Sequence, residues 1–135
     1  MLFRSDEQGR TLFAPHGVLE PNQIALAIAQ QNSCEYCLSA HTALGKKAGL
    51  SHEEIEANRA GSSLDAQAAV AVNLARSLME HHGEITTAEL LEARAAGFSD
   101  SDIVEIITHV GLNLPTNMIG KASRVDIDFP KVSLN

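Results

Sequence analysis

At 135 residues the chain has the length of one ordinary domain, and we expect a single domain over residues 1–135. Alanine contributes much of the 44% apolar content, while aromatic residues make up 4% and tryptophan is absent, which favours closely packed helices and an all-α fold. The formal net charge of −7, with scattered lysines and arginines, leaves no basic stripe, so no nucleic-acid partner is expected.

The N-terminal sequence MLFRSDEQGR lacks the apolar core of a signal peptide. No apolar run in the chain approaches the roughly 18 to 20 residues that a membrane span requires. We therefore expect a cytoplasmic protein without a membrane partner. In a reducing cytosol two cysteines do not form a structural disulfide scaffold, so a Cys-x-x-Cys pair there indicates chemistry or metal binding.

The first predicted elements are an N-terminal arm and a buried helix. Residues 1–19 show no sustained periodicity and are predicted to form the arm. Pro21 is well placed as a first helical residue, and the following NQIALAIAQQ is apolar almost all round, which predicts a helix buried on several sides. Asn32 and Glu35 then resemble a capping box, which predicts a second helix that ends at Gly49.

A repeated sequence pattern, here called the echo, marks two turns between helices, here called corners. GLSHEEI (49–55) and GFSDSDI (97–103) share a glycine that ends one helix, a serine that caps the next and an acidic residue three positions later. Between them, residues 64–82 predict a long alanine-rich helix and residues 86–96 a shorter helix with a threonine cap. The echo predicts a duplicated helical hairpin, although such corners also recur by chance in helical proteins.

The offset between the two echoes is 48 residues. At that offset the second copy carries no thiol, because the counterparts of Cys34, Cys37 and His41 are His82, Ile85 and Glu89.

The last long helix is predicted to begin near Asp100 and to run toward Pro115. Proline lacks an amide hydrogen and clashes with the preceding turn, so a kink or break is expected there. Residues 125–135 are predicted to be a C-terminal tail.

The stretch NSCEYCLSAH (32–41) holds both cysteines and one of the six histidines. On a helix Cys34, Cys37 and His41 share one face. A helix N-terminus and a neighbouring imidazolium can lower a thiol pKa from about 8.5 to between about 3.5 and 7.5. The resulting thiolate can attack a peroxide to give a sulfenic acid, which a second thiol traps as a disulfide. This pattern is typical of a redox dithiol with a resident base.

Two other interpretations of the same stretch stay open. The Cys-x2-Cys-x3-His spacing offers three zinc ligands, and a fourth would have to come from His52, His82 or His109. Alternatively, the cysteines are two small buried core residues. A c-type haem is excluded, because its motif needs histidine directly after the second cysteine, where Leu38 stands.

The segment CEYCLSAHTALGKKAGLSHEEI resembles the signature of the AhpD-like alkylhydroperoxidases, in the carboxymuconolactone decarboxylase superfamily. The similarity extends from about Pro21 to IDFPKV near the C-terminal end. It implies an AhpD-like helical bundle with an internally repeated helical hairpin. It also implies a peroxide-reducing oxidoreductase that needs no metal or other cofactor, is regenerated by an external dithiol reductant and forms a homotrimer or hexamer.

The resemblance also implies roles for individual residues. Cys37 would be the peroxidatic cysteine, Cys34 the resolving cysteine and His41 part of a proton relay. Proximity to the helix N-terminus alone would favour Cys34 as the more acidic thiol. We keep the assignment that the resemblance implies, with Cys37 as the peroxidatic cysteine, since Cys37 lies a single turn from His41.

The sequence departs from the family pattern at two relay positions. Asn22 stands where a glutamate is common, and Tyr36 precedes the second cysteine where some members have histidine. Glu20 and His109 are further candidates for the relay. These departures favour slow peroxide turnover, or an alternative task as a thiol-disulfide oxidoreductase or a redox-sensitive oligomeric binding module. Lactone decarboxylation, known from the superfamily, has no use for a dithiol.

Overall fold

The computed structural model describes residues 4–5, 11–12 and 19–135. The helices of this part are α1 (Pro21–Gln31), α2 (Glu35–Lys47), α3 (His52–Arg59), α4 (Ala66–Glu80), α5 (Thr87–Ala95) and α6 (Asp100–Ala122). The predicted all-α fold is confirmed. In the predicted arm, β1 (Arg4–Ser5) pairs antiparallel with β2 (Thr11–Leu12), a short ladder that the sequence pattern did not indicate, and the rest of the arm lies outside the described residues.

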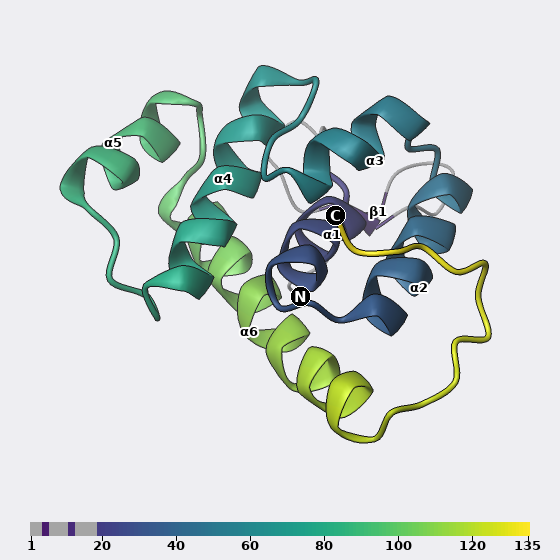
Figure 1. The fold of residues 1–135 in the computed structure, drawn as a ribbon. Helices are drawn as coiled ribbons and strands as arrows, with labels where there is room; N and C mark the ends of the chain where they lie inside the picture. Colours follow the sequence, from purple (N-terminus) through teal and green to yellow (C-terminus); the bar gives the residue numbers. More distant parts are fainter. Residues whose placement is uncertain (1–3, 6–10, 13–18) are drawn as a thin grey trace.

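Helix α1 lies at the centre of the fold and packs against α2, α3, α4 and α6 (Figure 1). Pro21 is its first residue, as predicted, and residues 23–29 are all buried. Glu20 caps the helix: its side chain accepts from the Asn22 amide, while Gln23 accepts from the Glu20 amide. This reciprocal pairing satisfies two amides that a helix start leaves open. It also fixes Asn22 at the entrance of the helix.

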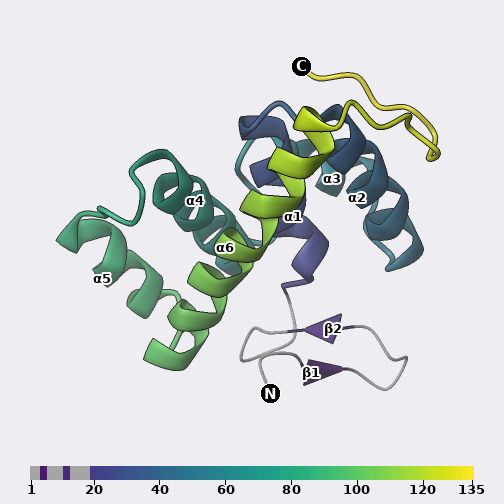
Figure 2. The same cartoon turned by 90° about the horizontal axis from the view of Figure 1, so that it is seen from below.

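The two predicted corners are confirmed. Gly49 and Gly97 follow helix ends with φ of 101° and 98°, a conformation that glycine adopts without steric cost. Ser51 and Ser99 then cap α3 and α6 by accepting an amide hydrogen from three residues on. In the described residues, α1, α2 and α3 are thus followed by a second set of three helices, α4, α5 and α6, with the glycine-serine turn between the second and third helix of each set. In Figure 2, α2 and α3 lie on one side of α1, α4 and α5 lie on the other, and α6 crosses between them.

The predicted Asn32–Glu35 capping box is wrong. Asn32 ends α1, and Ser33 follows with φ of 56°, a left-handed turn that the capping pattern did not foresee. The N-cap of α2 is Cys34, whose Sγ accepts a hydrogen bond from the Cys37 amide at 3.2 Å. The Asn32 side chain instead donates to Asn117 Oδ1 of α6 at 3.0 Å.

The predicted break at Pro115 is also wrong, because α6 runs from Asp100 to Ala122 without interruption. Proline leaves the carbonyl four residues earlier without its helical partner. Here that residue is Gly111, which is exposed and has open space around its Cα, so water can reach the freed carbonyl. Pro115 itself is exposed.

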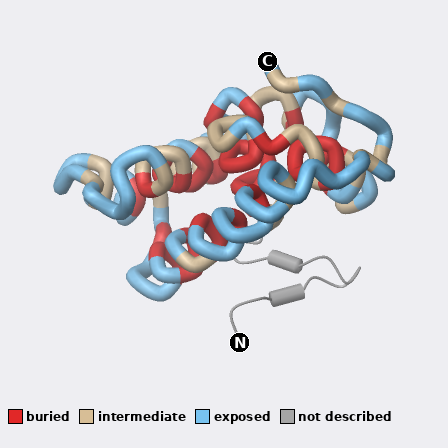
Figure 3. Tube along the Cα trace, turned by 60° about the horizontal axis from the view of Figure 1, so that its bottom comes forward, coloured by how far each residue is buried: buried red, intermediate tan, exposed pale blue. Residues whose placement is uncertain are grey.

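The buried side chains gather in two clusters, and Figure 3 shows the buried segments along the inner sides of the helices. The larger cluster joins α1, α4, α5 and α6. The smaller one contains both cysteines, and the partly buried Val132 and Leu134 of the tail pack against it. In the described part of the chain, no helix combines the length and the apolar character needed to cross a membrane.

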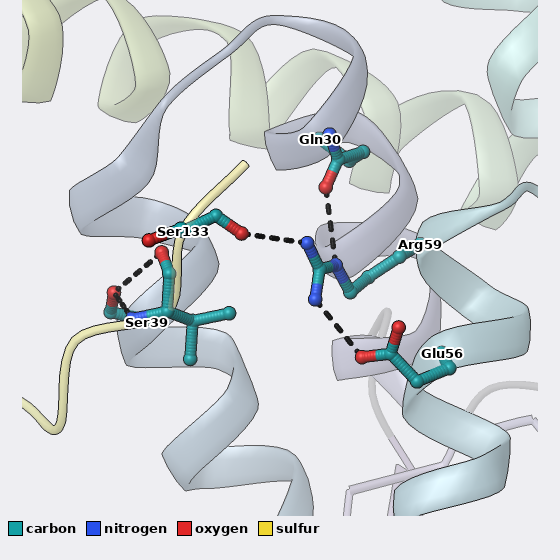
Figure 4. A network of polar contacts seen from close by, with 6 residues as sticks. Gln30, Ser39, Glu56, Arg59 and Ser133 are labelled. Carbon is teal, nitrogen blue, oxygen red and sulfur yellow. Dashed lines mark hydrogen bonds and ion pairs between the residues drawn. The ribbon is translucent and has the colours of Figure 1, made fainter. Parts of the chain in front are cut away.

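The C-terminal tail, which has no regular secondary structure as predicted, crosses α2 and ends near α1 (Figure 1). Figure 4 shows the polar contacts that hold it. Arg59 donates to the Ser133 carbonyl at 2.8 Å and also contacts Gln30 and Glu56. The Val132 amide donates to Ser39 Oγ at 2.9 Å. The tail is therefore part of the packing around the cysteines.

Candidate active site

The cysteine pair forms the centre of the site. Cys34 and Cys37 are joined by a disulfide, with Cα atoms 5.2 Å apart. Cys34 is 1% exposed and Cys37 is 5% exposed. Both belong to the first turn of α2, as N-cap and third helical residue, which places the two sulfurs side by side. The sequence predicted this proximity from the three-residue spacing.

Helix α6 forms the wall against which the disulfide lies. A Cβ atom on Gly120 would lie 3.0 Å from Cys34 Sγ and 3.4 Å from Cys37 Sγ. One turn earlier, the Thr116 carbonyl oxygen lies 3.7 Å from Cys37 Sγ. Glycine suits this approach, since a Cβ atom would crowd both sulfurs and one side would have to shift by a few tenths of an ångström. Gly120 is not among the predicted site residues, although a glycine inside an apolar helix costs about 1 kcal/mol and so indicates a packing requirement.

His41 lies one turn after Cys37, and its ring is tied to α1. His41 Nδ1 lies 2.8 Å from Asn22 Oδ1. Asn22 Nδ2 in turn donates to Glu20 Oε1 at 3.0 Å, while the Asn22 amide donates to Glu20 Oε2 at 2.9 Å. The contact joins α1 to α2 close to Gly45, whose Cβ would lie 3.7 Å from the Asn22 Cβ.

The direction of these hydrogen bonds assigns the histidine tautomer. An ionised carboxylate only accepts, so the Asn22 amide directs its nitrogen to Glu20 and its oxygen to His41. His41 Nδ1 must then carry the hydrogen, which leaves Nε2 with a lone pair. Burial lowers the pKa of His41 to about 4. The ring is therefore neutral at pH 7 and has one nitrogen free to accept a proton.

Cys37 and His41 share a cavity of about 500 Å³ between α2 and α6. Its lining is mostly apolar and includes Leu112, Thr116 and Ile119 of α6. A hydroperoxide that enters this cavity can meet the sulfur and the imidazole together.

The remaining relay candidates lie in different places. Tyr36 lines the same cavity, and its ring packs edge-on against Phe129 at a centroid distance of 5.9 Å. A hydrogen bond to Asp128 raises the pKa of Tyr36, as do burial and the charge of that carboxylate, so the phenol stays protonated. His109 is buried on α6 and does not line the cavity; burial lowers its pKa to about 4.

The ligands required for zinc are not gathered. Within the described residues, no group of three or more histidine, cysteine, aspartate or glutamate side chains is placed to hold a metal ion. The three nearest candidates are engaged otherwise, the cysteines with each other and His41 with Asn22.

Comparison with known proteins agrees with this geometry. Residues 22–80 match the carboxymuconolactone decarboxylase family. The match covers somewhat less than half of the chain, and it supports the resemblance to the AhpD-like members of the carboxymuconolactone decarboxylase superfamily. The segment that matches this family begins at Asn22, contains Cys34, Cys37 and His41, and ends before α5 and α6. No curated protein matches the chain.

Solved structures of the AhpD-like type share the fold. One is an uncharacterized peroxidase-related protein from a Silicibacter species, with 26% identity and a TM-score of 0.69 over 83% of this chain. The match spans 58% of that protein's length. Another is a protein of unknown function from Agrobacterium tumefaciens, whose name suggests an antioxidant defence protein, AhpD; it has 22% identity and a TM-score of 0.67, over 82% of this chain and 77% of its own. The expected AhpD-like helical fold is thereby confirmed.

Proposed function

We propose that this chain is a thiol-dependent peroxidase that reduces hydroperoxides through Cys37 and Cys34, with His41 as its base. The observation that carries the proposal is the shared cavity, in which Cys37 and the neutral imidazole of His41 face the same space. Cys34 already stands at bonding distance from Cys37. The antioxidant and peroxidase-related names of the similar structures support the same chemistry.

The reaction has three balanced steps. The Cys37 thiolate attacks the terminal oxygen of the hydroperoxide, the O–O bond breaks, and the alkoxide leaves as an alcohol after taking a proton. Cys34 then attacks the Cys37 sulfenic acid, which forms the disulfide and releases water. A dithiol reductant restores both thiols and becomes a disulfide itself.

His41 is proposed to accept the Cys37 proton on Nε2 and to return it to the leaving alkoxide. Asn22 cannot take a proton, so its role is to position the ring by holding Nδ1. Glu20 acts through Asn22: its carboxylate fixes the orientation of the amide and favours a positive charge on the imidazole.

A thiol titration against hydroperoxide tests the proposal. One equivalent added to the reduced protein should remove both titratable thiols and lower the mass by two hydrogens. Cys37→Ser should leave Cys34 unreactive at low peroxide, whereas Cys34→Ser should still consume one equivalent and form a sulfenic acid. Survival of both thiols in excess peroxide would reject a peroxidase.

A second candidate function follows from Asn22. With an amide in place of a relay carboxylate, the dithiol can serve as a thiol-disulfide oxidoreductase or a redox-sensitive binding element without peroxide turnover. Steady-state peroxide consumption in the presence of a dithiol separates the two candidates. Reversible disulfide formation without consumption supports the second.

We also propose that the chain forms a homo-oligomer, with a trimer or hexamer as the expected assembly. Helix α6 supports this, because large apolar residues at alternating spacings of three and four leave an exposed stripe around Gly111. The stripe comprises Val104, Ile107, Leu114 and Met118, which are 41% to 61% exposed.

A further inference from the structure

The two cysteines of the disulfide line different cavities. Cys37 lines the apolar cavity that also contains His41. Cys34 lines a second cavity of about 310 Å³, between the start of α2 and the end of α6. Tyr36, Gly120 and Val125 line both, so the two cavities adjoin at these residues.

The second cavity differs from the first in its charge. Its lining includes Lys121 and Arg124, both exposed, and the Glu35 carboxylate. Glu35 is paired with Lys131, whose Nζ lies 3.5 Å away. Lys121 Nζ also donates to the Asn32 carbonyl at 2.9 Å, and the Asp128 carboxylate is hydrogen-bonded to Tyr36 beside this cavity. The lining itself thus holds two cations against one carboxylate that is already paired, although the whole chain has a net charge of −7. This local excess of positive charge favours an anionic ligand.

We propose that the second cavity admits a small anionic thiol, which reduces the disulfide by attacking Cys34 Sγ. The proposal deepens the proposed peroxidase function, for which it supplies the reducing half-reaction. In the first step the thiolate forms a bond to Cys34, the Cys34–Cys37 bond breaks, and Cys37 leaves as a thiolate. In the second step a second thiolate, which in a dithiol reductant is its other sulfur, attacks the reductant sulfur bound to Cys34 and releases the reductant disulfide and the Cys34 thiolate.

The assignment of one cysteine to each cavity is compatible with attack at Cys34. Thiolate attack on a disulfide proceeds in line, from the side opposite the leaving sulfur. Approach to Cys34 from the second cavity releases Cys37 beside His41, on the side where the next hydroperoxide would bind. Oxidant and reductant then use separate spaces.

Attack at Cys37 is the alternative. It would release Cys34, whose sulfur accepts the Cys37 amide hydrogen and is thereby a stabilised leaving group. That route requires an anionic thiol to lose its hydration in the mostly apolar cavity, which is unfavourable for a charged group.

The charge preference can be measured without peroxide. The disulfide is formed with diamide and then reduced with 2-mercaptoethanesulfonate, 2-mercaptoethanol or 2-aminoethanethiol, which are similar in size but anionic, neutral and cationic. Rate constants per thiolate should fall in that order, by about threefold or more between the extremes at low ionic strength. Added salt should reduce the difference. Equal constants, or the reverse order, would overturn the proposal.

Charge variants locate the preference. Arg124→Gln, alone and with Lys121→Gln, should remove most of the order among the three thiols. The matched control Lys46→Gln/Lys47→Gln removes two charges from the far end of α2 and should preserve the order. If only the control variant lost the preference for anionic thiols, the charges responsible would lie outside the second cavity.

A trapping experiment identifies the attacked sulfur. The diamide-oxidised protein is mixed briefly with 2-mercaptoethanesulfonate and quenched with N-ethylmaleimide, and the cysteine-containing peptide is sequenced by mass spectrometry. We expect the thiol adduct on Cys34 and the maleimide on Cys37, and the opposite distribution contradicts the proposal. None of these experiments uses peroxide. A negative result here therefore leaves the peroxidase test valid, and a protein that fails the peroxidase test can still be tested for the site of thiol attack.

Discussion

Asn22 Oδ1 lies 2.8 Å from His41 Nδ1, and this contact connects the start of α1 to His41, the proposed proton acceptor of the candidate active site. The family resemblance leads one to expect a carboxylate at position 22. The structure instead has a carboxylate two residues earlier, at Glu20, which reaches the imidazole through the Asn22 amide. The ring is therefore oriented as a carboxylate would orient it but lacks an adjacent negative charge.

Replacing Asn22 with aspartate should supply that charge. In Asn22→Asp the carboxylate contacts His41 Nδ1, so the pKa of His41 should rise from about 4 to near or above its usual value of about 6.5. NMR titration of the imidazole measures this shift. Asn22→Ala is the control, because it removes the contact without adding a charge and should leave the pKa low. A titration midpoint unchanged in Asn22→Asp would contradict the geometry.

Stability should fall as the pH decreases from about 6.5 to about 4. His41 and His109 have their pKa lowered to about 4 by burial, so the unfolded chain binds more protons than the folded one throughout this interval. Each histidine should contribute up to about 1.4 kcal/mol per pH unit, fully developed only below pH 6. Urea unfolding at several pH values measures the slope.

His41→Gln provides the comparison for this pH dependence. The variant should retain only the contribution of His109 over the interval, so its slope should be shallower than that of the original protein. Parallel curves for the two proteins would mean that His41 binds protons equally in the folded and unfolded states, which contradicts a lowered pKa.

Gly120→Ala should disturb the disulfide directly. The added Cβ would lie 3.0 Å from Cys34 Sγ, so the oxidised protein should lose about 1 to 3 kcal/mol of unfolding free energy. Gly111→Ala is a matched control on the same helix, with open space around the new Cβ, and should be neutral or stabilising by up to about 1 kcal/mol. Denaturant unfolding of both oxidised variants measures the two free energies of unfolding. Equal changes in the two variants would contradict the close approach of Gly120 to the sulfurs.

Arg59→Ala should loosen the C-terminal tail. The guanidinium is 7% exposed, and its loss leaves Gln30 and the Ser133 carbonyl without their donor, at a cost of about 1 to 3 kcal/mol. Hydrogen exchange of the Val132 amide should accelerate as well. Arg94→Ala removes an exposed ion pair with Asp100 and should cost less than about 1 kcal/mol. Unchanged exchange at Val132 would show that the tail is held by its apolar contacts alone.

The exposed stripe on α6 predicts the outcome of a charge substitution. Met118→Asp, which replaces a side chain 61% exposed in the monomer, should lower the molar mass measured by light scattering if α6 is the interface. Leu64→Asp is the control, because Leu64 is 69% exposed outside α6. An oligomer that persists in Met118→Asp would place the interface elsewhere.

Local rules explain which parts of the site were predictable from sequence. The three- and four-residue spacings placed Cys34, Cys37 and His41 together because helix geometry alone determines that face. The Gly-x-Ser corners followed from backbone and capping preferences that act over a few residues. The same local rules failed at Ser33, whose left-handed conformation moved the cap from Asn32 to Cys34.

Other parts depend on long-range packing. The approach of Gly120 to the sulfurs joins residues more than 80 positions apart, and no local pattern encodes it. The failure at Pro115 has a similar origin, since the exposure of Gly111 decides whether the freed carbonyl can be hydrated. His109 looked like a relay candidate in the sequence, but its place relative to the cavity is set by how α6 packs.

The contact of Gly120 with both sulfurs has a consequence for how the two halves of the chain depend on each other. The segment that matches the family contains Cys34, Cys37 and His41, whereas α6, which lies outside that segment, carries no thiol yet closes one side of the disulfide. Residues 22–80 thus hold both thiols but only part of the structure that encloses them. Substitutions in α6 that leave the Cys-x-x-Cys motif unchanged can therefore alter the surroundings of both thiols.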